Sequence, residues 1–429
     1  MVIADDFTGA LDTGVQFSKK GVPVLVLTAA RFVGGLDGAA ASSEAKVLVV
    51  DTESRHLPSG EAKDVVVRVV RDAWKNGFRR FYKKTDSALR GNIGAELSGL
   101  LEAVDFPRPC LTFVPAFPKS RRVTRGGVHY IDGVEAALSV FSKDPFTPVT
   151  RSAVADVIHL QTDIPTENIT SDAYEKAALR PQLEKIIRIL DAETMDDIEA
   201  MGRHLKRGDN LDLLAGCAGF AEILPELLEL PGREMKWERS GDCLLVVSGS
   251  VNPISVEQTA LGEALGFSTI SLSLEQKLNE CYSHSAECAD FVQRVADALL
   301  RNKRVLIRTV ESTAKAELVA EYASVLGLAE NEIPFRVASN IGEITLQIVN
   351  VARVENLAVF GGDTLHVVLS KMGCRGVVPL VEIAPGVVAA KVLCDHYDGL
   401  VITKSGGLGE KDVLRQICEF ISGGALTPN

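Results

Sequence analysis

The sequence lacks the marks of several protein classes. No uninterrupted apolar run approaches the roughly 20 residues that a membrane-spanning helix needs, and the first residues, MVIADD, carry two acids where a signal peptide carries positive charge. The chain has 46 Lys and Arg against 57 Asp and Glu, and its net charge of −11 argues against a general nucleic-acid binder. We therefore expect a cytoplasmic protein whose partners are small molecules, with no nucleic acid and no membrane.

Several metal-binding and catalytic motifs are missing as well. The eight cysteines form no CxxC pair and the seven histidines show no HxH or HxxxH spacing, so neither a zinc site nor a thioredoxin-like site is expected. No GxxxxGK[ST] motif occurs, no GxGxxG follows an expected strand, and no GxSxG is present. These absences argue against a P-loop, a dinucleotide-binding fingerprint and an α/β-hydrolase.

What is present predicts a globular protein of two domains. The chain has 429 residues, and 46% of them are hydrophobic, which is enough for sizeable cores. Polar and turn-forming residues gather at 232–241, directly before a new apolar run. We expect an N-terminal domain over 1–235 and a C-terminal domain over 240–429.

One pattern recurs in both halves. Short runs rich in Val, Ile and Leu end in Gly, Ser, Thr or Asp, and helical spacing follows, as in 47–50 before 65–73 and in 400–402 before 413–421. Such runs are typical of strands buried on both faces, joined by amphipathic helices. The sequence therefore predicts an α/β fold in which each domain has a mainly parallel sheet flanked by helices. The segment 191–230 is interpreted as helices and loops that close the first domain.

Charged and hydroxyl residues follow the apolar runs of the first half. Ligands of parallel sheets bind beyond the carboxyl ends of the strands, so these residues are candidates for a site. Arg grips a carboxylate with two hydrogen bonds and Asp accepts from hydroxyls, which suits a small polyhydroxylated anion. The plainer alternative is that the Asp5-Asp6 pair only caps a helix and that the basic run 119–125 is a solvated loop. The candidates are Asp5, Asp6, Arg55, Lys84, Thr85, Asp86, Ser87 and Arg90.

The apolar runs of the second half end in glycine-rich turns with little charge. These turns are 248–250, 361–364 and 405–407. Glycine lets the backbone approach a ligand closely, and the N-terminus of a following helix presents free N–H groups to phosphate. One Gly-Gly turn is usually only a tight turn, but three at expected strand ends of one domain favour a nucleotide site.

The motifs together resemble the four-carbon acid sugar kinase family. In the first half they are IADDFTGA (3–10), DTESR (51–55), KTDSALRGN (84–92) and PAFP (115–118). In the second half they are GSVNP (249–253), GGDT (361–364), EIAPG (382–386) and TKSGGLG (403–409). The resemblance spans nearly the whole chain in the expected order. Members of this family begin with a longer first strand, so a longer native N-terminus stays open.

The resemblance implies an N-terminal domain that binds the sugar acid, a C-terminal domain that binds ATP, and an active site in the cleft between the domains. The implied enzyme is an ATP-dependent kinase that phosphorylates a hydroxyl of threonate, erythronate or a close derivative with Mg²⁺. The resemblance, carried over residue by residue, implies that the eight candidates above bind the sugar acid. It implies that Asp6 or Asp86 accepts the proton of the attacking hydroxyl. The nucleotide side takes Ser250, Gly361, Gly362, Asp363, Thr364 and Gly406.

Two other functions stay open at this point. An NAD(P)-dependent dehydrogenase of a small hydroxy acid fits two α/β halves, although the dinucleotide fingerprint is missing. A non-catalytic sensor of sugar acids fits two domains that close on a ligand. The residues do not decide the stereoisomer of the acid, the identity of the base, the metal ligands or the oligomeric state, for which a homodimer is the commonest assembly.

Overall fold

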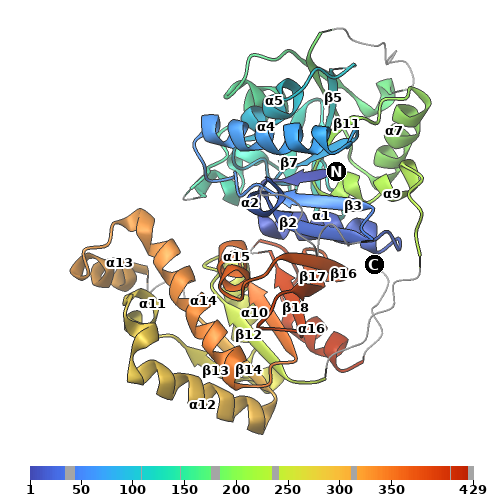
Figure 1. The fold of residues 1–429 in the computed structure, drawn as a ribbon. Coiled ribbons are helices and arrows are strands. Elements are labelled where there is room, and N and C mark those ends of the chain that lie inside the picture. Colours follow the sequence, from blue (N-terminus) through green and yellow to red (C-terminus); the bar gives the residue numbers. More distant parts are fainter. Residues whose placement is uncertain are drawn as a thin grey trace. The chain divides into compact units, whose positions relative to one another are not determined.

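The chain folds into two compact units in a computed structural model. The structure describes residues 1–33, 44–107, 109–144, 146–174, 184–233, 241–310, 316–405 and 407–423. The N-terminal unit is Met1–Met235 and the C-terminal unit is Lys236–Asn429 (Figure 1). No helix within the described ranges is both long and apolar enough to cross a membrane.

A parallel sheet forms the centre of the N-terminal unit. Its strands stand in the order β2-β3-β1-β4-β11-β5-β10-β9, and all of its neighbouring pairs are parallel. The strands are β1 (Val2–Ala4), β2 (Val24–Thr28), β3 (Val47–Asp51), β4 (Phe81–Lys84), β5 (Cys110–Val114), β9 (Thr166–Ile169), β10 (Ile186–Leu190) and β11 (Leu213–Gly216). β1, β3 and β4 are buried along their whole length, as strands covered on both faces require.

Helices pack in two groups around this sheet. α2, α4, α5 and α6 contact one another in sequence, and α1, α7, α8 and α9 form the second group (Figure 1). The helices are α1 (Phe7–Ser18), α2 (Ala29–Val33), α4 (Ser59–Lys75), α5 (Ile93–Glu102), α6 (Val154–His159), α7 (Met195–Arg207), α8 (Ala218–Ala221) and α9 (Leu224–Leu227). On α4 the buried residues Ala62, Val66, Val69, Val70 and Ala73 share one face, in agreement with the helical spacing of the sequence.

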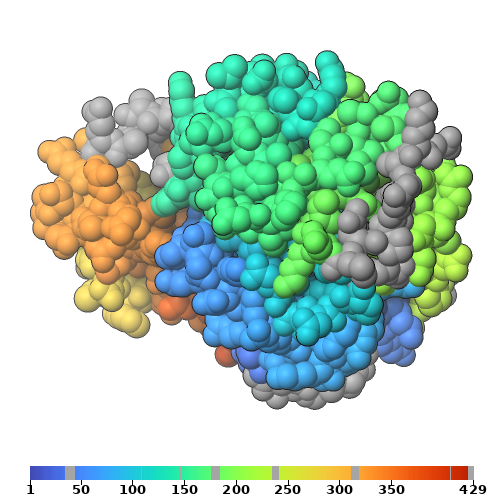
Figure 2. Space-filling view, turned by 90° about the horizontal axis from the view of Figure 1, so that it is seen from above, coloured from blue at the N-terminus to red at the C-terminus, as the bar shows by residue number. Residues whose placement is uncertain are grey.

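An additional small sheet belongs to the N-terminal unit. β6 (Arg122–Arg125), β7 (Val128–Ile131) and β8 (Val134–Glu135) are antiparallel, and the tight turn between β6 and β7 places Gly126 and Gly127 at positive φ. Figure 2 shows the segment around this sheet, coloured teal to green, as a layer over the face of the unit that is turned to the viewer.

The C-terminal unit has a second sheet that is parallel over most of its width. The strand order is β13-β14-β12-β15-β18-β17-β16, and the pairs are parallel except β18–β17 and β17–β16, which are antiparallel. The strands are β12 (Leu244–Ser248), β13 (Ser268–Ser271), β14 (Arg304–Arg308), β15 (Asn356–Phe360), β16 (Gly376–Ala384), β17 (Val387–Leu393) and β18 (Leu400–Lys404). The antiparallel pair is joined at Gly386, which has φ +75°.

Two groups of helices flank this sheet as well. α10 packs on α16, whereas α11, α12, α13, α14 and α15 pack among themselves (Figure 1). The helices are α10 (Pro253–Ala260), α11 (Leu274–Leu278), α12 (Ala286–Asn302), α13 (Ala316–Val325), α14 (Ile333–Val351), α15 (Gly362–Lys371) and α16 (Val413–Ile421). The apolar face of α16, including Leu414, Ile417 and Phe420, closes a core with Val246 and Ile402 of the sheet.

The α/β class and the mainly parallel sheets flanked by helices are confirmed. The interpretation of 191–230 as helices and loops was wrong at one point, because β11 is a buried strand between β4 and β5. Its four residues, LLAG, are too few to show a period.

Candidate functional site

Three adjacent strands of the N-terminal unit end at the same level. Ala4 of β1 pairs with Asp51 of β3 on one side and with Lys84 of β4 on the other. The residues that follow these strand ends therefore come together, although they are far apart in the sequence. We call Asp5, Asp6, Arg55, Lys84, Asp86 and Arg90 the charged cluster.

Arg55 holds the first half of the cluster together. Its Nε donates to Asp5 Oδ2 at 2.8 Å and its Nη2 to Asp6 Oδ1 at 2.5 Å, while Asp86 Oδ1 lies 3.7 Å from Nη2. The Arg55 side chain is only 11% exposed. Burial alone would raise the pKa of the Asp5 carboxyl, but Arg55 and Lys84 outweigh it and lower that pKa to about 2. Asp5 is therefore ionised at neutral pH.

Asp6 caps α1 and belongs to the cluster at the same time. Its Oδ1 accepts the backbone N–H of Gly9 at 3.2 Å and its Oδ2 the hydroxyl of Thr8 at 2.6 Å. Lys84 Nζ lies 3.9 Å from Asp6 Oδ1 and 3.7 Å from Asp5 Oδ1. A side chain at Gly9 would collide with Asp6 and with Lys84 Nζ, so only glycine lets the helix start this close to the lysine. Asp6 therefore caps α1 and also belongs to the charged cluster.

Asp86 and Arg90 form the second half of the cluster. Arg90 Nε donates to Asp86 Oδ2 at 3.0 Å and Nη2 to Oδ1 at 2.8 Å, a bidentate pair, and Nη1 reaches Asp144 Oδ2 at 3.1 Å. The backbone N–H groups of Ala88 and Arg90 also donate to Asp86 Oδ2. Burial works against the Asp86 carboxylate, but Arg90 and Arg55 hold its pKa well below the usual range.

Thr85 and Ser87 lie in the same turn, and their backbone groups connect it to β11 and to the small sheet. Thr85 is fully buried, and its N–H donates to the carbonyl of Gly216 at the end of β11. The Ser87 carbonyl accepts Nε2–H of His129 at 2.9 Å, and Nδ1 of that ring lies 3.1 Å from the Thr124 hydroxyl. Burial lowers the pKa of His129 to about 4, so the ring is neutral and ties the small sheet to this turn.

A second charged pair lies behind the cluster. Lys83 Nζ and Glu96 Oε2 are 2.9 Å apart, and their side chains are 0% and 1% exposed. Glu96 also accepts the hydroxyl of Ser54, and Lys83 donates to the carbonyl of Lys84. The pair thus anchors the two segments that carry Arg55 and Lys84. Burial raises the pKa of Glu96.

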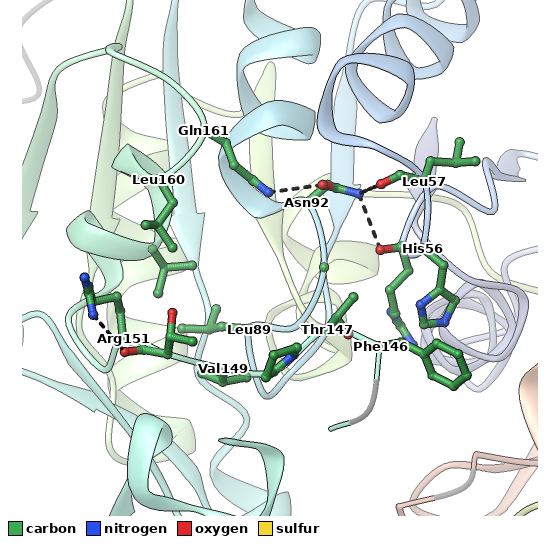
Figure 3. Close-up of a pocket in the computed structure, with 15 residues that line it drawn as sticks. His56, Leu57, Leu89, Asn92, Phe146, Thr147, Val149, Arg151, Leu160 and Gln161 are labelled. Atoms are coloured by element: carbon green, nitrogen blue, oxygen red, sulfur yellow. Dashed lines mark hydrogen bonds between the residues drawn. The ribbon is translucent and has the colours of Figure 1, made fainter. Parts of the chain in front are cut away.

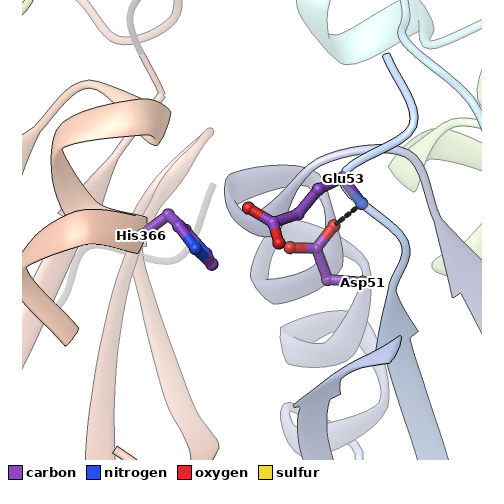
Figure 4. Close-up of side chains that lie close together, drawn as sticks. All are labelled: Asp51, Glu53 and His366. Atoms are coloured by element: carbon purple, nitrogen blue, oxygen red, sulfur yellow. Dashed lines mark hydrogen bonds between the residues drawn. The ribbon is translucent and has the colours of Figure 1, made fainter. Parts of the chain in front are cut away.

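The end of β3 carries another buried acid. The Asp51 side chain accepts the backbone N–H of Glu53 at 3.0 Å (Figure 4), and Glu53 has a positive φ of 50°. Burial raises the pKa of the Asp51 carboxyl well above its ordinary value. The pKa of Asp51 is therefore shifted in the opposite direction to that of Asp5, which Arg55 and Lys84 hold in the ionised form.

A pocket of 320 Å³ opens beside Arg55 in the N-terminal unit (Figure 3). The Asn92 side chain connects two segments of the pocket lining. Its Nδ2 donates to the carbonyls of Ser54 and Leu57, and its Oδ1 accepts a hydrogen bond from Gln161 Nε2 at 3.1 Å. Asn92 thereby fixes the loop that carries Arg55. The polar part of the lining includes Arg55, His56, Asn92, Thr147, Arg151 and Gln161.

The C-terminal unit brings two strand ends together around glycines. The N–H of Gly249, after β12, donates to the carbonyl of Phe360 at the end of β15. A side chain on Gly249 would collide with the Thr364 hydroxyl, and Gly361 has a φ of +113° that favours glycine. A Cβ on Gly361 would lie 3.4 Å from the Ser250 backbone nitrogen. We call Gly249, Ser250, Gly361 and Thr364 the glycine turns.

Helix starts follow both turns. Gly361 is the N-cap of α15, which begins with Gly362 and the exposed Asp363, and the Asn252 side chain caps α10 by accepting the N–H of Ile254 at 3.0 Å. The first N–H groups of a helix have no partner within it, so they favour an anion. Of the six predicted nucleotide residues, Gly406 lies outside the described residues, and the other five lie at this edge.

Some residues of these sites were missed by the sequence reasoning. Asp144, which pairs with Arg90, lies 54 positions further along the chain, in a loop with no strand before it. Glu96 lies inside α5, a helix with mostly apolar residues. A buried acid one turn into α5 was a signal that could have been used, because Glu in a helix that is otherwise apolar needs a partner.

Two family models match the chain. Residues 1–224 match the family model of a sugar-binding N-terminal domain, and residues 245–414 match that of a nucleotide-binding C-terminal domain. A D-threonate kinase of Salmonella typhimurium is 29% identical and a D-erythronate kinase of Heliobacterium modesticaldum is 28% identical, with 98% of this chain covered in both cases and 98% and 96% of those proteins.

The fold recurs in a solved structure. A Haemophilus influenzae protein superposes with a TM-score of 0.70 at 21% identity over 98% of this chain and 99% of that one. Both family models match in order and together cover most of the sequence. The chain therefore belongs to the four-carbon acid sugar kinase family.

Proposed function

We propose that the protein transfers the γ-phosphoryl group of ATP to a hydroxyl of a four-carbon sugar acid, such as threonate or erythronate, with Mg²⁺. The observation that supports this best is the chemical contrast between the two units. The N-terminal unit gathers three cations and three carboxylates at one sheet edge, and the C-terminal unit gathers glycines and helix starts. The relatives named above are kinases of such acids.

The charged cluster suits an acceptor with one carboxylate and several hydroxyls. Arg55, Lys84 and Arg90 supply donors for the carboxylate, and Arg55 has five N–H donors of which Asp5 and Asp6 take two. Asp5 stays ionised in this setting and accepts from hydroxyls. The side chains of the cluster hold one another in place before the acid binds, so binding should cost little side-chain entropy.

We propose Asp6 as the group that accepts the proton of the attacking hydroxyl. Arg90 and Arg55 hold the pKa of Asp86 well below the usual range, which makes Asp86 a weak base. The Asp6 side chain is 20% exposed, against 9% for Asp86. Asp86 then acts by fixing the guanidinium of Arg90.

The C-terminal unit offers donors that suit nucleotide and metal. The first N–H groups of α15, beginning with Gly362, have no partner within the helix and suit phosphate oxygens. Mg²⁺ prefers carboxylate and hydroxyl oxygens and retains waters, which fits Asp363 and Thr364 at the start of α15. Bound there, Mg²⁺ would neutralise phosphate charge, and phosphoryl transfer depends mainly on such neutralisation and on positioning.

The direct test is ADP release measured by a coupled assay. The panel contains threonate and erythronate of both hands, their ketone derivatives, and three- and six-carbon acids as size controls. We expect ADP release that depends on a four-carbon acid and on Mg²⁺, with a phosphate ester of the acid as the product. ADP release that is the same without any acid, or oxidation of the acid with NAD(P), would contradict the proposal.

A further inference from the structure

A buried lysine ends β18, the strand next to β15 in the C-terminal sheet. Lys404 is the last residue of β18, and its side chain is 0% exposed. Its Nζ donates to the hydroxyl of Ser255 in α10 at 2.8 Å and lies 5.6 Å from the ring centroid of Phe360, the last residue of β15. A fully buried lysine is rare in proteins, because removing an ammonium from water is costly.

Lys404 joins all the segments that carry the glycine turns. Its carbonyl accepts the N–H of Gly361 at 3.1 Å, and its side chain reaches α10, the helix that follows Ser250. From the same helix, Gln258 Nε2 donates to the carbonyls of Gly409 and Glu410, in the loop that follows β18. Ser248, Phe360 and Lys404 are paired in register, so β12, β15 and β18 end at the same level and Lys404 is one of the three terminal residues.

The position of this charge has a consequence for an anion. The low-dielectric surroundings of a buried ammonium strengthen its interaction with charges nearby. Burial lowers the pKa of Lys404 to about 7, so a bound polyanion would stabilise the ammonium form. The glycine turns lie at the ends of the neighbouring strands, and Lys404 adds a cation to the same group of strand ends.

We infer that Lys404 is a positioning residue of the nucleotide site, whose buried ammonium holds the ends of β15 and β18 against α10 and favours the phosphates bound above it. This inference rests on the proposed function, since it assumes that the glycine turns bind nucleotide. The inference predicts a dependence on the number of phosphates. An ammonium that acts on phosphate contributes more to the binding affinity as the number of phosphates grows, whereas a purely structural role would affect the affinity for every nucleotide equally.

The test compares adenosine, AMP, ADP and ATP as ligands of the full-length protein by calorimetry. In Lys404→Met, which replaces the ammonium by an apolar chain of similar length, we expect unchanged adenosine affinity, a small loss for AMP and a loss of about tenfold or more for ATP. Lys404→Arg keeps the charge and should retain most of the ATP affinity. Lys391→Met removes an exposed lysine of the neighbouring strand β17 and should change nothing.

A second variant tests the charge without removing the lysine. Ser255→Asp places a carboxylate beside the ammonium and neutralises its field, so the loss of affinity should again grow from AMP to ATP, whereas Ser255→Ala should have little effect. This pair decides the question if Lys404→Met does not fold. The inference would be overturned if a variant lost equal affinity for adenosine and for ATP, or if neither Lys404→Met nor Ser255→Asp lost affinity for ATP. Either result would leave the proposed function intact. If the wild-type protein bound no nucleotide at all, the proposed function would fall first and the inference with it.

Discussion

At the scale of single residues, the acid side of the protein is a set of ion pairs that share partners. Arg55 pairs with Asp5 and Asp6, and Arg90 pairs with Asp86 and Asp144. Isolated surface pairs contribute little, but here removal of one partner leaves a buried charge without compensation. Substitutions that keep shape and hydrogen bonding are therefore the informative ones.

Asp6 and Asp86 are expected to differ in the kinetic constant that they control. Asp6→Asn keeps an oxygen for the helix cap but removes the proton acceptor, so kcat should fall about 100-fold or more while KM for the acid changes little. Asp86→Asn weakens the hold on Arg90, so KM for the acid should rise while the affinity for ATP is unchanged. Steady-state kinetics with the preferred acid measure both. If Asp6→Asn retained wild-type kcat, Asp6 would not be the base.

His129 predicts how stability depends on pH. Its pKa is about 4 in the folded protein, against an ordinary value of about 6.5, so the unfolded chain binds this proton more tightly than the folded one. The free energy of unfolding should therefore be fully retained above pH 6.5 and should fall by about 3 kcal/mol as the pH drops toward 4. Chemical denaturation across this range measures the slope. His129→Gln has no such proton, so an unchanged slope in that variant would contradict the assignment.

At the scale of elements, both sites depend on how closely a helix start approaches its neighbour. α1 begins against Lys84, and α15 begins against Gly249, and in both cases the contact requires glycine. The sequence predicted these places, because charged or glycine-rich residues directly after apolar runs mark the carboxyl ends of parallel strands.

Two glycine substitutions should therefore separate the two binding functions. Gly9→Ala forces Asp6 or Lys84 to move, so KM for the acid should rise about tenfold or more while ATP binds normally. Gly249→Ala forces Thr364 to move, so ATP binding should weaken while acid binding is spared. Each variant is the control for the other, and Gly60→Ala in α4, where a Cβ meets nothing within 4 Å, controls for the substitution itself. Equal effects of Gly9→Ala on both ligands would contradict the division.

The sequence could not predict which polar residues are buried behind these edges. The partners Lys83 and Glu96 are 13 positions apart and Lys404 pairs with Ser255 across 149 positions, so no local spacing links them. A lysine at a strand end is expected to be exposed, because most lysines in proteins are exposed. The strand β11 was missed for the related reason that a four-residue strand between two neighbours is defined by tertiary contacts and not by its own period.

At the scale of the whole molecule, the chain combines two units whose sheets share a design and whose strand ends differ in chemistry. The order of the two family matches follows the same division. The active site in a cleft between the domains, the homodimer and the cytoplasmic location stay predictions from the sequence. Light scattering of the purified protein tests the homodimer directly.

The most direct measurement of the central claim is hydrogen exchange with each ligand added alone. The four-carbon acid that supports turnover should slow exchange in the N-terminal unit around residues 5–9, 52–55 and 84–92, and leave 249–252 and 361–365 unchanged. A non-hydrolysable ATP analogue with Mg²⁺ should slow exchange at 249–252 and 361–365 and leave the charged cluster unchanged. Protection of the charged cluster by the nucleotide alone, or of the glycine turns by the acid alone, would contradict the account.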